Sequence, residues 1–125
     1  MKVLLIEPDR VLAEAISAAF TQHKHQVTWK RGAQKALDAL DDTIPDLIVL
    51  EIQLGLHNGI EFLYEIRSYP EWQNIPVVVH TLNSKVLDRQ FTNAFADLHV
   101  LAVLYKPRTS TQQLVHVLNQ FVGVE

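Results

Sequence analysis

The chain contains no cysteine among its 125 residues. This absence excludes disulfide bonds, thiolate metal sites and cysteine nucleophiles. Long apolar runs are also missing. The run at residues 3–6 is far too short for a signal peptide, and nothing approaches the roughly 18 uninterrupted apolar residues that a membrane helix needs. We therefore expect a cytoplasmic protein that makes no membrane contact.

An excess of positive charge is missing too. Eleven Lys and Arg residues are set against 14 Asp and Glu residues, and the formal net charge is -3 at pH 7. Without a broad basic surface to hold phosphates, we expect no nucleic-acid partner. The six histidines show no metal-ligand spacing, so no metal site is expected. His80 and His99 are interpreted as structural or exposed.

Short runs of Val, Ile and Leu recur along the chain and are separated by longer segments with helical spacing. The runs lie at residues 3–6, 47–50, 77–79 and 101–105, and residues 26–29 form a weaker strand, nearer an edge. Each strong run is continuously apolar, which is typical of parallel strands covered on both faces. Helices are predicted after Asp9, at residues 33–40, after Gly59, within residues 84–96 and from about Thr109.

This order of strand and helix, repeated five times, predicts an α/β protein with a doubly wound, five-stranded parallel sheet in three α/β/α layers. The length suits a single domain spanning residues 1–125. Apolar residues lie on more than one side of the last predicted helix, at Leu114, Val115, Val117, Leu118, Phe121 and Val122. That excess would suit a homodimer or another partner contact through the face of the fourth and fifth elements.

In such sheets, ligands and chemistry gather at the carboxyl ends of the strands. The residues that follow the strands here are Glu7, Pro8 and Asp9, then Glu51, then His80 and Thr81, then Lys106 and Pro107. Acidic groups, a hydroxyl and a lysine, far apart in sequence, are therefore expected at one rim of the sheet.

With these residues in this order, the chain resembles the receiver domain of bacterial response regulators. The resemblance extends from Val3 to about Phe121 and depends on the segments LLIEPD, PDLIVLEI, NGIEFL, IPVVVHT and YKP. It implies a flavodoxin-like (βα)5 fold and a role in two-component (phosphorelay) signal transduction, as a signalling module rather than an enzyme. A histidine kinase or a downstream effector protein would be its partner.

In that family, an aspartate after the third strand accepts a phosphoryl group, acidic residues beside it hold magnesium, and a hydroxyl residue and a lysine contact the phosphoryl group. The resemblance places Glu51 at the acceptor position, Glu7 and Pro8 at the acidic pair, and Thr81 and Lys106 at the contact positions. Asp9 is a further acidic-pocket candidate, although we expect it to cap a helix. Pro107 is a candidate for a cis peptide bond.

Two of these positions depart from the family in kind. The extra methylene of Glu51 moves its oxygens away from the in-line position that phosphoryl transfer requires. Pro8 has no side-chain oxygen, so we expect magnesium binding to be weak or lost and no cofactor to be required. Val103 also replaces the aromatic residue that receivers usually carry three places before the lysine.

These departures favour a receiver that works by protein binding, with Glu51 reaching Lys106 as a fixed surrogate for a phosphorylated aspartate. One alternative is a receiver that retains weak phosphoacceptor chemistry at Asp9 or Asp46. Another is an N-terminal receiver cut from a longer transcriptional regulator. A small doubly wound enzyme or nucleotide binder is disfavoured, because no glycine-rich loop follows the first strand.

Overall fold

The computed structural model describes residues 1–55 and 57–121. Its main sheet has five parallel strands in the order β2-β1-β3-β6-β7, with β2 at one edge as expected. The strands are β1 (Lys2–Ile6), β2 (Gln26–Lys30), β3 (Leu47–Leu50), β6 (Val77–Thr81) and β7 (Val100–Tyr105). The predicted parallel sheet is therefore confirmed, and β3 lies at its centre.

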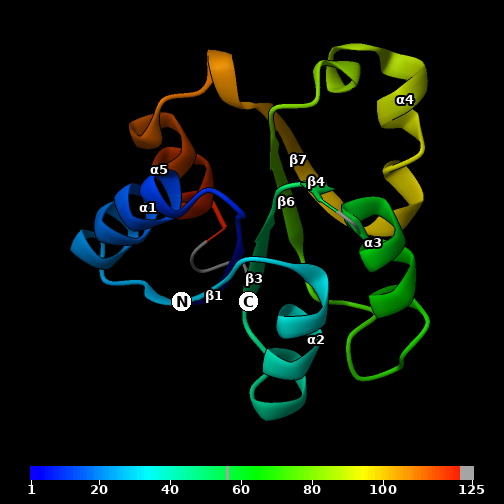
Figure 1. Cartoon of the computed structure of the whole chain (residues 1–125), viewed down its shortest axis with the longest axis horizontal. Helices are drawn as coiled ribbons and strands as arrows, with labels where there is room; N and C mark the ends of the chain where they lie inside the picture. Colours follow the sequence, from blue (N-terminus) through cyan, green and yellow to red (C-terminus); the bar gives the residue numbers. More distant parts are fainter. Residues whose placement is uncertain (56, 122–125) are drawn as a thin grey trace.

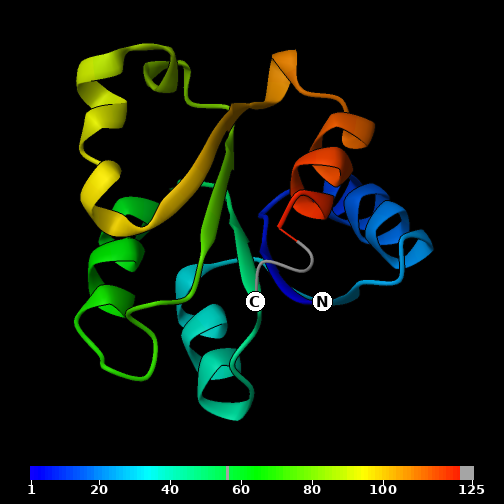
Figure 2. The ribbon, with the colours of Figure 1, turned by 180° about the vertical axis from the view of Figure 1, so that it is seen from behind.

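Helices cover both faces of this sheet. Helices α1 (Arg10–Gln22) and α5 (Thr111–Asn119) lie on one face, and α2 (Ala33–Asp42), α3 (Gly59–Arg67) and α4 (Arg89–Asn93) lie on the other (Figure 1). The same three layers are seen from behind in Figure 2. This arrangement confirms the doubly wound α/β/α architecture. No helix in residues 1–55 and 57–121 is long and apolar enough to cross a membrane.

Side chains of the continuously apolar strands pack into two separate hydrophobic cores, one on each face of the sheet. In β3, Ile48 and Leu50 pack toward α2 and α3, whereas Leu47 and Val49 pack toward α1 and α5. Successive side chains of a strand point to opposite faces, so a strand covered on both sides must be apolar at every position.

Local hydrogen bonds fix where the helices begin. The Asp9 carboxylate accepts a hydrogen bond from the Leu12 backbone N–H at 3.3 Å and caps α1, as expected. The Ser110 hydroxyl accepts from the Gln113 backbone, while the Gln113 side chain accepts from the Ser110 backbone, which forms a capping box at α5.

The helix expected within residues 84–96 is present as α4, but it is short, and a 3₁₀ turn lies on each side of it. This segment contains the 3₁₀ turn η1 (Ser84–Leu87), the short helix α4 and the turn η2 (Ala96–Leu98). Asp88 ends one piece and begins the next, because its extended backbone breaks the helix while its carboxylate caps α4 through the Gln90 N–H.

Two further features were not expected from the sequence. The antiparallel pair β4 (Gln53–Leu54) and β5 (His57–Asn58) follows β3. In addition, His80 and Thr81 belong to β6 itself instead of following it.

Most of the apolar excess predicted for the last helix lies inside the molecule. Leu114, Val115 and Leu118 are buried, and Val117 and Phe121 pack against the core shared with α1. Val122 lies outside the described residues. The large apolar side chains that are exposed from the end of β6 through β7 are instead Leu82, Leu87 and Leu101, which are 56%, 50% and 46% exposed.

At the amino-terminal ends of β6 and β7, the half-buried guanidinium of Arg67 ties several segments together. Its Nε donates to the Leu98 carbonyl at 2.7 Å, its Nη1 to the Trp72 carbonyl at 3.1 Å, and its Nη2 to the Ile75 carbonyl at 2.8 Å. Burial lowers the pKa of Arg67 from its ordinary value. The end of α3 is thus fixed to the loop before β6 and to the turn before β7.

Candidate functional site

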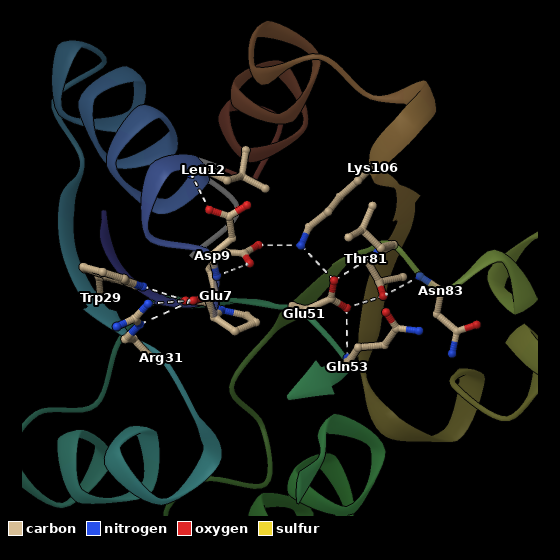
Figure 3. A network of polar contacts seen from close by, with 12 residues as sticks. Glu7, Asp9, Leu12, Trp29, Arg31, Glu51, Gln53, Thr81, Asn83 and Lys106 are labelled. Carbon is tan, nitrogen blue, oxygen red and sulfur yellow. Dashed lines mark hydrogen bonds and ion pairs between the residues drawn. The ribbon is translucent and has the colours of Figure 1, made fainter. Parts of the chain in front are cut away.

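The carboxyl ends of the central strands bring four polar side chains together. Glu7 follows β1, Glu51 follows β3, Thr81 ends β6 and Lys106 follows β7, and Figure 3 shows their side chains in one connected network. Glu7, Glu51 and Thr81 are at most 2% exposed. Residues far apart in sequence therefore form one buried polar cluster, and Glu7, Glu51, Thr81 and Lys106 are called the latch below.

The ammonium group of Lys106 lies between the two carboxylates. Its Nζ is 2.6 Å from Oε1 of Glu7 and 2.8 Å from Oε1 of Glu51. The Lys106 side chain is only 7% exposed, and both glutamate side chains are 2% exposed. Two buried negative charges thus share one buried positive charge, and each carboxylate depends on the lysine for compensation.

Both carboxylate oxygens of Glu51 are fully engaged. Oε1 accepts hydrogen bonds from Lys106 Nζ at 2.8 Å and from the Leu82 backbone N–H at 3.0 Å. Oε2 accepts from the Thr81 hydroxyl and from the Gln53 backbone N–H at 3.0 Å. A carboxylate offers about four acceptor positions, so these four donors occupy its capacity.

The same contacts decide the charge state of Glu51. Burial acts to raise its pKa, but the hydrogen bonds from Lys106, Thr81 and the backbone of Gln53 and Leu82 outweigh burial. They hold the pKa of Glu51 below its ordinary value of 4.5. Glu51 is therefore an ionised, hydrogen-bonded carboxylate at neutral pH.

Thr81 connects the latch to the segment that follows β6. Its hydroxyl donates to Glu51 and accepts a hydrogen bond from the Asn83 backbone N–H at 3.1 Å. The Asn83 side chain in turn accepts from the Lys85 N–H at 3.0 Å at the start of η1. The position of η1 is thus linked to Glu51 through a chain of hydrogen bonds.

Groups from β2 and the following turn fix the chain around Glu7 and Pro8. Oε2 of Glu7 accepts from the Asp9 N–H at 3.0 Å, and the Glu7 carbonyl accepts from Trp29 Nε1 at 2.8 Å. Arg31 donates to the Pro8 carbonyl through Nε and Nη2, each at 3.3 Å. Sequence reasoning missed Trp29 and Arg31 here. The strand predicted at residues 26–29, which pairs with β1 in the structure, was a usable signal.

A pocket of about 310 Å³ opens above the latch. It is lined by Glu7, Pro8, Asp9, Leu12, Glu51, Gln53, Leu82, Lys106 and Pro107. Its lining combines charged side chains of the latch with apolar ones, and Leu82 among them is 56% exposed.

The prediction of a cis peptide bond at Pro107 is wrong. No cis peptide bond occurs in the described part of the chain, so the Lys106–Pro107 bond is trans. Pro107 lies inside the 3₁₀ turn η3 (Lys106–Arg108). There the ordinary trans form of an X–Pro bond and the fixed φ of proline suit the start of a helical turn.

His80 is a buried polar residue near these groups, and its side chain has taken no part in the contacts described so far. It is 5% exposed, and its Nδ1 has no hydrogen-bond partner among the described residues. Burial and then the charge of Lys106 lower the pKa of His80 to about 4, and Glu51 opposes this only in part. His99, by contrast, is exposed and adopts the left-handed backbone conformation, with a φ of 55°.

Comparisons with known proteins agree with this geometry. The family model of the response regulator receiver domain matches residues 3–119. The chain is 32% identical over 88 residues to the transcriptional regulatory protein CpxR of Escherichia coli K12, covering 70% of this chain and 36% of CpxR. It is 39% identical over 68 residues to the autoinducer 2 sensor kinase/phosphatase LuxQ of Vibrio harveyi, covering 54% of this chain and 8% of LuxQ.

The chain thus spans little more than a third of CpxR and a small part of LuxQ. Among solved structures, the non-phosphorylated HemR receiver domain from Leptospira biflexa aligns with a TM-score of 0.87 at 21% identity, covering 99% of this chain and 95% of that one. This likeness confirms the flavodoxin-like receiver fold.

Proposed function

Because the chain belongs to the response regulator receiver domain family of two-component signalling, we propose that it is a receiver locked by its own Glu51. In this proposal, the domain signals by binding a protein partner and does not accept a phosphoryl group. The observation that carries the proposal is the saturation of the Glu51 carboxylate by Lys106, Thr81 and two backbone N–H groups.

The saturated carboxylate bears on phosphoryl transfer in two ways. First, phosphoryl transfer depends mainly on the position of the nucleophile, and every acceptor position of Glu51 is already directed at a donor. Second, the resemblance assigns Thr81 and Lys106 to contacting a phosphoryl group, and both contact Glu51 instead. The carboxylate thereby imitates part of a phosphorylated aspartate, with less negative charge.

The proposal includes the loss of the magnesium site. Glu7 is engaged by Lys106 and by the Asp9 N–H, Glu51 is saturated, and Pro8 has no side-chain oxygen. Magnesium requires near-octahedral oxygen ligands, and these residues do not fit it in their present arrangement. In residues 1–55 and 57–121, no group of three or more His, Asp and Glu side chains is placed to hold a metal ion.

The partner proposed is a histidine kinase or a downstream effector. Self-association through the fourth and fifth elements is part of the same proposal, now with Leu87 and Leu101 among the exposed apolar side chains. A chain that remains monomeric in sedimentation velocity at high concentration would contradict self-association and leave the locked receiver untouched.

The alternative acceptors receive little support from their positions. Asp46 lies before β3, where its Oδ2 accepts from the Lys2 N–H at 2.8 Å, at the opposite end of the sheet from the latch. Asp9 is engaged as the cap of α1. The longer-regulator alternative is compatible with the locked receiver, since CpxR is a transcriptional regulatory protein and this chain matches 36% of its length.

Incubation with acetyl phosphate and magnesium, followed by intact-mass measurement, tests the proposal. We expect the wild-type mass to remain unchanged. The double variant Pro8→Asp/Glu51→Asp, with Thr81 and Lys106 intact, is the matched positive control. Phosphorylation of the control shows that the assay detects a competent pocket, and a phosphorylated wild type would overturn the proposal.

A further inference from the structure

His80 is buried and directly precedes Thr81 of the latch in the chain. Its own strand, β6, continues directly into Thr81, which donates to Glu51. Across the sheet, His80 pairs with Leu104 of β7, two residues before Lys106. A titratable ring with an unpartnered nitrogen thus sits on the strand that carries the latch hydroxyl, beside the strand that leads into the latch lysine.

The charges that act on His80 come from two other strands. Lys106, after β7, repels a protonated ring, and Glu51, after β3, attracts one. Glu7, after β1, is bound to the same ammonium as Glu51. A protonated His80 would therefore be repelled by Lys106 and attracted by Glu51.

We propose that His80 makes the latch sensitive to acid, because uptake of a proton by its ring weakens the contact between Lys106 and Glu51 and opens the cluster. This inference depends on the proposed function, because it takes the same latch geometry as its starting point. It adds that the pH controls whether the locked receiver stays locked. In the open state, Lys106 moves away from Glu51 and water enters the cluster.

The direction and size of the effect follow from linkage. The pKa of His80 is about 4 in the latched structure, and its ordinary value is 6.5, which we assign to the open state. Protons therefore bind the open state better, and acid shifts the equilibrium toward it. Between pH 7 and pH 5 the ratio of open to latched molecules rises roughly 20-fold for one such group. Glu51 contributes little in this range, because its pKa lies below its ordinary value of 4.5.

Amide hydrogen exchange, corrected for intrinsic exchange rates, measures this opening. The Gln53 and Leu82 N–H groups both donate to Glu51 and report the latch. The Val49 N–H in the central strand reports global unfolding. From pH 7 to pH 5, we expect the protection of Gln53 and Leu82 to fall roughly 20-fold. Because global unfolding also releases His80, the protection of Val49 falls by a similar factor, but Val49 remains better protected than Gln53 and Leu82 at both pH values.

Two variants separate His80 from the other histidines. The His80→Leu variant places an apolar side chain in the buried position. The exchange protection of Gln53 and Leu82 should then lose most of its pH dependence. The matched control His116→Leu removes an exposed histidine of α5 and should keep it. Equal pH dependence in His80→Leu and wild type would overturn the inference. Equal protection of Val49 and Leu82 at each pH would also overturn it, because Leu82 would then exchange only through global unfolding.

This experiment can fail independently of the proposed function. If the exchange protection of the Gln53 and Leu82 amides does not change with pH, the acid sensitivity is refuted and the locked receiver still stands. A wild type that accepts phosphate would instead refute the locked receiver, whatever the exchange data show.

Discussion

A buried cation, Lys106, and a half-buried cation, Arg67, hold opposite ends of the same sheet, and their surroundings differ. At the carboxyl end, Lys106 is neutralised by the carboxylates of Glu7 and Glu51. At the amino end, Arg67 donates to backbone carbonyls of Leu98, Trp72 and Ile75. Carboxylates gain and lose protons, whereas carbonyls do not. The difference indicates that the Lys106 end can respond to pH and to a binding partner, and that the Arg67 end is a fixed support.

The largest expected effect is that of Lys106→Met. Without the ammonium, two buried carboxylates are left facing each other without compensation. We expect a loss of about 4 kcal/mol in the free energy of unfolding at pH 7, measured by urea denaturation. Lys85→Met, which removes an exposed lysine of η1, is the matched control and should change stability by less than about 0.5 kcal/mol.

The loss in Lys106→Met should shrink as the pH is lowered. The unpaired carboxylates then have raised pKa values, and protonation relieves their repulsion as the pH falls through those values. A loss that stays constant from pH 7 to pH 4 would contradict the account of the latch as an electrostatic cluster.

Arg67→Met tests the other end of the sheet. Removing the guanidinium takes one hydrogen-bond donor from each of the Leu98, Trp72 and Ile75 carbonyls, and we expect a loss of about 3 kcal/mol in the free energy of unfolding. In contrast to the lysine variant, this loss should be the same at pH 7 and pH 4, because its acceptors do not titrate. Arg108→Met, at an exposed arginine of η3, is the matched control. If the stability loss in Arg67→Met depended strongly on pH, the two ends of the sheet would not differ in their response to pH.

Gly59→Ala disturbs the carboxyl end without changing any charge. A Cβ added at Gly59 would lie 2.5 Å from the Ile52 Cα and 3.0 Å from the Glu51 carbonyl oxygen, so the backbone after β3 must shift. We expect the free energy of unfolding to fall by about 2 kcal/mol, measured by urea denaturation. Gly32→Ala, where an added Cβ meets nothing within 4 Å, is the matched control and should be close to neutral. Equal losses in the two variants would show that the approach of Gly59 to Ile52 is unimportant.

The smallest effect concerns acid stability between about pH 5 and pH 3. The pKa of Glu51 is lower in the folded chain than its ordinary value, so its stabilising contribution is complete above the ordinary value and is lost as the pH falls through the folded value. Glu51→Gln should therefore lose less stability than wild type over this range, while His80 contributes to both curves. Parallel curves would indicate that Glu51 is not held in the ionised form.

Much of this arrangement could be predicted from the sequence. Continuous apolar runs identified the parallel strands, and the rule for carboxyl ends placed Glu7, Glu51, Thr81 and Lys106 on one rim. The long reach of Glu51 toward Lys106 followed from its extra methylene.

The remaining features depend on backbone geometry that single residues do not encode. The Gln53 and Leu82 N–H groups reach Glu51 only because of the shape of their loops. Arg67 donates to backbone carbonyl groups, which every residue has. Side-chain types in the sequence therefore could not indicate its partners. The trans bond at Pro107 and the broken segment around Asp88 likewise depend on turns that are set by the surrounding fold.

The central claim is that Lys106 holds Glu51 as an ionised, saturated carboxylate, and an NMR titration of the Glu51 side-chain carboxyl carbon tests it most directly. The account predicts a titration midpoint below the ordinary glutamate value of 4.5 in wild type, and a midpoint raised above the wild-type value in Lys106→Met. A wild-type midpoint at or above 4.5, unchanged by removing Lys106, would contradict it.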